Sequence, residues 1–221
     1  MSVLRVLGGG ATHGFVEQVR AAFEAESGDR IDGTFGAVGA MRDKLLAGEP
    51  VDVMFLSRAL IEALARDGHL VAASMTDVAR VATSVAVRAG DPPPNIADRD
   101  GLRDALLAAD EIHFPDPEQA TAGIHFAKVM RELGIGDRVA GRLRTAPNGN
   151  TAMRALAQSR SDRPIGCTQE TEIRATPGVI LAGPLPPGCE LVTTYTAAIT
   201  SRSRASSSAR RLLDKLAHPA R

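Results

Sequence analysis

The sequence predicts an α/β fold made of two doubly wound lobes that are joined by two crossover strands. Along most of the chain, apolar strand-like runs alternate with amphipathic helix patterns, which is typical of parallel sheets covered by helices. The prolines Pro92–Pro94 interrupt this alternation after a strand predicted over residues 81–87. A second long extended segment, residues 190–200, can lead the chain back. We therefore expect one lobe to comprise residues 1–83 with 193–221, and the other residues 84–192.

The first lobe begins with three strand–helix pairs. The apolar run 51–56 is nearly continuous, which indicates a buried parallel strand. Ser57 follows this strand and is expected to cap the next helix, because a serine hydroxyl can accept a hydrogen bond from an early helix amide. Strands are predicted over 3–7, 30–35 and 51–56, and helices over 14–26, 40–47 and 58–67.

The second lobe follows the proline run. Asp100 is expected to cap its first helix. Strands are predicted over 111–114, 142–145, 164–167 and, at an edge, 178–181; helices are predicted over 101–109, 123–133 and 151–158. After the extended segment, a helix over 205–217 closes the chain against the first lobe.

Composition excludes several classes of function. Aromatic residues make up only 3% of the 221 residues and there is no Trp, so we expect no aromatic platform for sugars or single-stranded nucleic acid. The formal net charge is zero, which predicts no nucleic-acid partner. No apolar run approaches 18 residues and no secretion signal is evident, so we expect no membrane insertion and a cytoplasmic location, or a periplasmic one if a signal has been removed.

The two cysteines do not indicate a metal or disulfide framework. Cys167 and Cys189 form no CxxC pair and have no histidine at a zinc-ligand spacing. We expect both to be small packed residues, and we expect no metal and no cofactor.

Turns rich in small residues precede the helical patterns and are the main functional signal. A helix N-terminus has free N–H groups and partial positive charge, so it attracts anions, and small residues let a ligand approach the backbone. Strand-to-helix turns are often small and polar without any ligand, which is the structural alternative. Ligands of doubly wound sheets bind at the carboxyl ends of strands, and we expect a site between the lobes. The expected contacts are Gly9, Gly10, Ala11, Thr12, Ala37, Val38, Gly39, Thr121, Ala122, Gly123, Asn148, Asn150, Thr151, Thr168 and Gln169.

Several segments resemble the molybdate-binding branch of the type II periplasmic binding proteins. Phe35–Met41 and Leu45–Val53 are similar to the first-lobe signature of that family. Phe114–Pro117 with Thr121–His125 is similar to the second-lobe signature, and Gly183–Pro186 to the return crossover. The resemblance covers nearly the whole chain. It implies a module that closes on a small anion, and an ABC permease as partner if the protein is exported.

The departures from that pattern concern the ligand. Ala37 and Val38 stand where the family has serines, and Thr168-Gln169 stands where a tyrosine is expected. A tetrahedral oxyanion in a dry site needs donors for every oxygen. Loss of these hydroxyls favours an organic carboxylate over a molybdate-type oxyanion.

A second branch of the fold fits these departures. Val85–Gly90 and Ala122–Ala127 resemble the solute-binding-like proteins that include aconitate isomerase. That resemblance implies a cytosolic isomerase that moves a double bond in an unsaturated polycarboxylate by a 1,3-proton shift. Such chemistry needs a group that titrates near neutral pH, and His13 and His125 are the catalytic candidates because both lie near predicted helix starts. The alternative for both histidines is a surface position without function.

Overall fold

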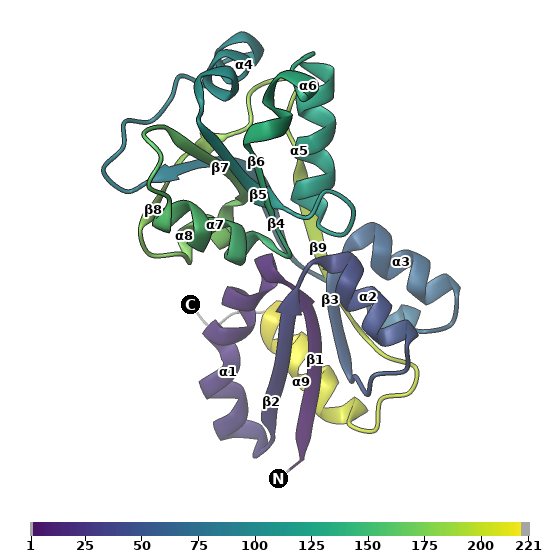
Figure 1. Cartoon of the computed structure of the whole chain (residues 1–221). Coiled ribbons are helices and arrows are strands. Elements are labelled where there is room, and N and C mark those ends of the chain that lie inside the picture. The colour runs from purple at the N-terminus through teal and green to yellow at the C-terminus, as the bar shows by residue number, and fades with distance from the viewer. Residues whose placement is uncertain (1, 218–221) are drawn as a thin grey trace. The chain divides into compact units, whose positions relative to one another are not determined.

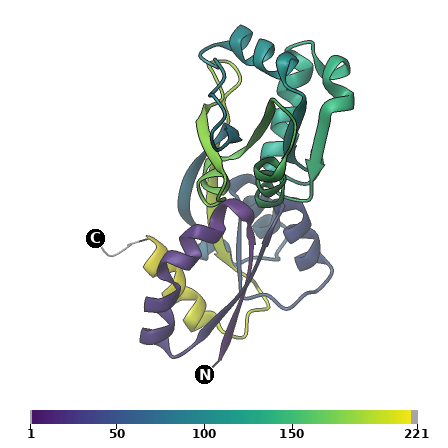
Figure 2. The same cartoon turned by 60° about the vertical axis from the view of Figure 1, so that its left-hand side comes forward.

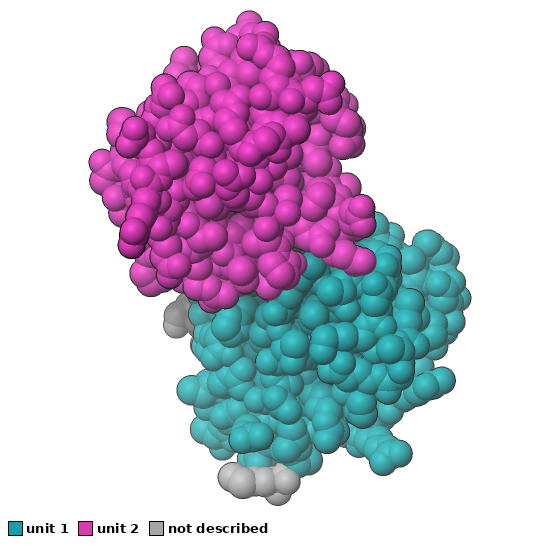
Figure 3. Space-filling view, viewed as in Figure 1, with its two compact units in different colours: residues 1–80, 193–221 teal, residues 81–192 magenta. Residues whose placement is uncertain are grey.

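The computed structural model describes residues 2–217, and the chain divides into two compact units (Figure 3). Unit 1 comprises residues 1–80 and 193–221, and unit 2 comprises residues 81–192. The chain passes from one unit to the other twice, within strand β4 (Thr76–Arg88) and within strand β9 (Val192–Ile199). Each unit has its own hydrophobic core, and each is described by itself below.

Unit 1 contains a sheet with the strand order β2-β1-β3-β9. Strand β1 is parallel to both of its neighbours, and β9 runs antiparallel to β3. Helices α1 and α9 lie side by side and cover one face (Figures 1 and 2). The elements are β1 (Val3–Gly9), η1 (Gly10–Thr12), α1 (His13–Ser27), β2 (Arg30–Gly36), α2 (Val38–Leu46), β3 (Val53–Ser57), α3 (Arg58–Arg66), η2 (Ala72–Ser74), β9 and α9 (Ser206–Ala217).

The core of unit 1 lies between the sheet and the pair α1 and α9. Leu4 and Val6 on β1 pack there with Phe23 of α1 and Leu212 of α9, and all four are buried. Burying a large apolar side chain contributes about 1.5–3 kcal/mol, so this face anchors the strand whose carboxyl end carries the first small-residue turn.

Unit 2 contains a sheet with the strand order β4-β7-β5-β6, and β8 pairs with the other edge of β4. Strands β7, β5 and β6 are parallel, and β4 is antiparallel to β7. The elements after β4 are α4 (Arg99–Ala108), β5 (Glu111–Pro115), α5 (Thr121–Glu132), α6 (Gly136–Val139), η3 (Ala140–Arg142), β6 (Leu143–Ala146), α7 (Gly149–Gln158), β7 (Pro164–Gln169), α8 (Glu170–Arg174) and β8 (Val179–Pro184).

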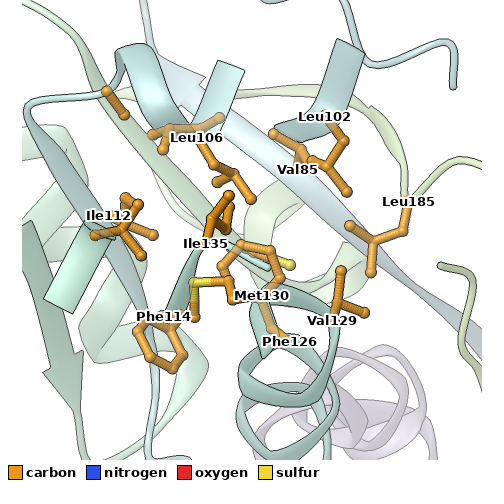
Figure 4. Packing of buried hydrophobic residues seen from close by; sticks show 14 of the residues in the cluster. Val85, Leu102, Leu106, Ile112, Phe114, Phe126, Val129, Met130, Ile135 and Leu185 are labelled. Carbon is orange, nitrogen blue, oxygen red and sulfur yellow. The ribbon is translucent and has the colours of Figure 1, made fainter. Parts of the chain in front are cut away.

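Two apolar clusters cover the two faces of the unit 2 sheet. The larger one joins Leu106 of α4, Phe114 of β5 and Phe126 of α5 (Figure 4). The Phe114 and Phe126 rings meet edge to face with centroids 5.6 Å apart, a favoured aromatic geometry. On the opposite face, Met153 of α7 and Ile173 of α8 pack in the smaller cluster. These packed faces fix the helix starts at the carboxyl ends of the parallel strands.

Some local predictions are wrong. Helix α4 is capped by Asp98, whose carboxylate accepts the Gly101 amide over 2.8 Å, and not by Asp100, which lies inside the first turn. Ser57 holds the N-cap position of α3, but its side chain makes no cap hydrogen bond. The short helices α6 and α8 were not predicted. Helices α2, α5 and α7 each begin two residues earlier than predicted, so the small turn residues form the first helical turn itself.

Candidate functional site

The two predicted turns of unit 1 lie next to each other. Strands β1 and β2 are parallel and in register, with Gly9 beside Gly36 at their carboxyl ends. A Cβ on Gly9 would lie 2.8 Å from Cγ1 of Val38. Position 9 therefore requires glycine, because Val38 at the start of α2 packs directly against it.

The side chains of these turns offer few outward donors. The Thr12 hydroxyl donates to the Gly9 carbonyl over 2.7 Å and is fully buried, so its proton points into the turn. Ala37 is the N-cap residue of α2, with no side-chain cap, and both it and Val38 are buried. What this end of unit 1 can present to an anion is the set of first backbone amides of α2, since these have no partner within the helix.

Two residues that sequence reasoning did not assign to the site lie at the same edge. Ser57 ends β3, and Tyr195 of β9 is its antiparallel neighbour in register. Tyr195 is the chain's one tyrosine and is buried, and a Cβ on Gly9 would lie 3.2 Å from its ring. The signal for Ser57 was its place after a buried strand, whereas nothing in the local sequence points to Tyr195.

Unit 2 brings three predicted turns to one edge of its sheet. Strand β5 pairs with β6 on one side and β7 on the other, all three parallel, so the segments after them meet at the same edge. These segments hold the predicted contacts Thr121, Ala122, Gly123, Asn148, Asn150, Thr151, Thr168 and Gln169.

Helix α5 approaches the end of β5 very closely. A Cβ on Gly123 would lie 2.2 Å from the Asp116 carbonyl oxygen and 2.3 Å from that of Pro115. Only glycine fits there, and the Asp116 side chain accepts the Glu118 and Gln119 amides to shape the turn. The start of α5 has an alanine N-cap with no side-chain hydrogen bond, so its first amides resemble those of α2.

The start of α7 is different, because a carboxylate of the protein already lies there. Glu172 of α8 is buried and accepts hydrogen bonds from the backbone amides of Asn150 and Gln169. Its Oε2 also accepts the Thr168 hydroxyl over 2.6 Å. Asn148 caps the helix by accepting the Thr151 amide over 2.9 Å. Five of the predicted ligand contacts therefore have a backbone amide or a side chain engaged inside the protein: Asn148, Asn150, Thr151, Thr168 and Gln169.

Burial dominates the ionisation of Glu172. Desolvation raises its pKa to about 7, against the lowering effect of the Thr168 hydroxyl and the Gln169 and Asn150 amides. This carboxyl therefore changes charge near neutral pH. No sequence pattern points to Glu172, because the short α8 segment holds two glutamates and only burial distinguishes Glu172 from Glu170.

The two candidate histidines occupy different settings. His13 is the first residue of α1, its side chain is 52% exposed, and its Nε2 lies 3.4 Å from Glu17 Oε1. Its ring also packs on Phe35 with centroids 4.6 Å apart. His125, in the first turns of α5, places Nε2 2.8 Å from the Cys189 carbonyl oxygen. Because a carbonyl only accepts, Nε2 of His125 carries the proton, and Nδ1 is the nitrogen that can receive one.

Other polar groups are structural. Arg88 donates to the Ser159 and Ser161 carbonyls and pairs with Asp91, so it is held away from any ligand role. His113 is buried beside Glu111, and burial lowers its pKa. Cys167 and Cys189 are free and buried, and burial raises the pKa of both thiols. Within residues 2–217, no group of three or more His, Cys, Asp or Glu is arranged to hold a metal ion, and no helix is long and apolar enough to cross a membrane.

Comparison with known proteins agrees with the resemblance found in the sequence. Residues 4–221 match the family described as bacterial extracellular solute-binding protein. An aconitate isomerase from Pseudomonas sp. is 27% identical over 228 residues, which covers 98% of this chain and 83% of that protein.

Solved structures confirm the predicted fold class. The periplasmic molybdate-binding protein of Azotobacter vinelandii superposes with a TM-score of 0.79 at 19% identity, over 98% of this chain and 93% of that one. A sulfate-binding protein from Mycobacterium tuberculosis gives a TM-score of 0.76 at 18% identity, over 98% of this chain and 82% of that one. At these identities the likeness establishes the α/β fold of type II periplasmic binding proteins and not the ligand.

Proposed function

The chain belongs to the family of bacterial extracellular solute-binding proteins, and we propose that it binds a small organic carboxylate at the helix-opening turns of its units. Proteins of this family bind small solutes, and structural neighbours bind molybdate and sulfate. The observation that carries the proposal is the start of α2, where Ala37 and Val38 supply no hydroxyl. Backbone amides there match a planar carboxylate, which has two oxygens to satisfy, better than a tetrahedral dianion.

Unit 2 supports the same preference. The amides at the start of α5 are flanked by small residues, whereas an amide at the start of α7 is bonded to Glu172. An external oxyanion that needed both helix starts would meet a carboxylate at one of them, and like charges at close range disfavour each other.

The test is a binding screen on the purified protein. Thermal shift and calorimetry are run with molybdate, tungstate and sulfate, and with citrate and the cis and trans isomers of aconitate. A ligand that binds only the folded state raises Tm, and at a given concentration a tighter ligand raises it more. We expect a carboxylate to bind and the inorganic oxyanions to be weaker. Submicromolar molybdate binding with no response to carboxylates would overturn the proposal.

A second candidate is an isomerase of an unsaturated polycarboxylate, favoured by the likeness to an aconitate isomerase along 98% of the chain. The reaction removes a proton from the carbon at one end of an allylic system and returns a proton to the other end. Nδ1 of His125 or of His13 would accept the proton, and helix-start amides would stabilise the enolate charge that develops on the carboxylate. Incubation with cis- or trans-aconitate in D2O, followed by NMR, tests this. If neither isomerisation nor deuterium incorporation is observed at high protein concentration, the isomerase candidate is refuted and ligand binding is the remaining function.

A further inference from the structure

Unit 2 contains a buried carboxylate at the position where an α-helix attracts an anion. Helix α7 spans ten residues, and the Asn150 amide in its first turn donates to Glu172. Glu172 lies on α8, and its Oε2 accepts a hydrogen bond from the Thr168 hydroxyl over 2.6 Å. It thus has the partners that a bound anion would have: helix-start amides and a hydroxyl.

Gly149 shows that the position is shaped for this oxygen. A Cβ on Gly149 would lie 2.0 Å from Glu172 Oε2 and 2.2 Å from Thr168 Oγ1. Its φ is not one that demands glycine, because only positive-φ glycines need that freedom and Gly149 is not among them. The absent side chain therefore makes room for an oxygen atom against the backbone.

Ser84 is an independent indication that the anion position at the start of α7 can serve a ligand other than Glu172. It is fully buried, and its Oγ has no hydrogen-bond partner among the described residues. Ser84 is the register neighbour of Thr168 across β4 and β7, so the two side chains lie on one face of the sheet. Ala86, two residues along β4, packs on α7 and α8, which places this face toward Glu172. Ser84 is therefore a buried hydroxyl without a hydrogen-bond partner among the described residues, on the same face of the sheet as the Thr168 hydroxyl that Glu172 binds.

We propose that Glu172 is a resident anion, a carboxylate of the protein that occupies the anion position of α7 and can be replaced there by an external small carboxylate when its side chain is removed. It thereby denies this helix start to solutes and leaves α5 as the ligand-binding helix of unit 2. The inference that α5 is the ligand-binding helix of unit 2 rests on the proposed function. The inference that Glu172 occupies the anion position of α7 does not.

The experiment replaces Glu172 with Ala and measures Tm in sodium formate and in sodium chloride of equal ionic strength at pH 8. The matched control is Glu170→Ala. Glu170 lies on the same helix and pairs with Arg174 at the surface. We expect Glu172→Ala to lose roughly 5 °C in chloride, since buried donors lose their acceptor, and to regain most of it in formate with a saturable dose dependence. The parent protein and Glu170→Ala should respond to formate equally and much less than Glu172→Ala.

Equal formate responses of Glu172→Ala and Glu170→Ala would overturn the proposal. If Glu172→Ala does not fold in chloride, its refolding yield in formate decides: a yield restored by formate supports the proposal, and equal failure in both salts refutes it. This outcome is separate from the ligand screen, because that screen uses the parent protein and does not involve formate at α7.

Discussion

Gly9 faces the ring of Tyr195 so closely that a methyl group on its Cα would lie 3.2 Å from Cε1 of that ring. The same methyl would lie 2.8 Å from Cγ1 of Val38, which is closer than real Cβ contacts allow. Three segments that are separate in sequence, the end of β1, the start of α2 and strand β9, are thus packed around one glycine. The amides at the start of α2 owe their position to this contact.

We expect Gly9→Ala to lower the free energy of unfolding by about 1–3 kcal/mol, the usual cost of overpacking a core. Val38→Ala in the same chain removes the Cγ1 atom that the new methyl meets, so the double variant should recover part of the loss. The control is Gly14→Ala, in the first turn of α1, where a Cβ meets nothing within 4 Å. Urea unfolding of the parent, the two single variants and the double variant measures the coupling between positions 9 and 38. Additive effects of Gly9→Ala and Val38→Ala would show that the loss in Gly9→Ala does not come from this contact.

Ala37→Ser tests whether the missing hydroxyl at α2 sets ligand choice. Ala37 has the extended φ of −61° and ψ of 137° of an N-cap residue, and serine there can accept an early amide of the helix. We expect a gain of about 1 kcal/mol in unfolding free energy and tighter molybdate binding by calorimetry, because a hydroxyl donor is added beside the amides. Ala40→Ser, inside the same helix, should give neither effect. A serine at 37 that leaves the ratio of molybdate to carboxylate affinity unchanged would contradict the role given to this position.

Much of the fold could be predicted from sequence because strand and helix periods are local. The nearly continuous run 51–56 and the amphipathic run 14–26 correspond to β3 and α1 with shifts of one or two residues. Helix starts were placed too late, because small residues such as Ala122 and Gly149 read as turn although they form the first helical turn.

The candidate site was less accessible to sequence reasoning because its chemistry depends on long-range contacts. Glu172 lies on a helix of five residues, too short for a periodic signal, and its partner Asn150 is 22 residues away. Tyr195 lies in a segment correctly predicted as extended, but its place beside Gly9 follows from strand order and not from local pattern. The small-residue turns could be found from the sequence. The sequence could not show that Glu172 already occupies the turn at the start of α7.

Glu172 should make the protein less stable as pH rises from about 4.5 to about 7. Its folded pKa is raised from 4.5 to about 7 by burial, so in this window the folded state binds a proton that the unfolded state has released. Stability from this group is therefore fully present below the unfolded pKa and is lost as pH rises through the folded one, by roughly 3 kcal/mol in total. Glu172→Gln removes the titration, so the difference in unfolding free energy between the parent and this variant should change across pH 4.5–7 and be flat above pH 8. A constant difference from pH 4 to 9 would show that Glu172 ionises normally.

His125 provides the sharpest test of the isomerase candidate. Its Nε2 is committed to the Cys189 carbonyl over 2.8 Å, so a base at this position acts through Nδ1. Glutamine places its amide nitrogen near the Nε2 position and can keep that hydrogen bond, but it cannot take a proton near neutral pH. In a protein that isomerises aconitate, His125→Gln should lower turnover about 100-fold or more and leave the substrate affinity in place. His13→Gln is measured beside it, because its Nε2 faces Glu17 and its Nδ1 is the competing base. His69→Gln, on the loop after α3, is the control for loss of a histidine as such. A turnover that survives both His125→Gln and His13→Gln would remove both histidines from the proton transfer and direct the search for the base to another group.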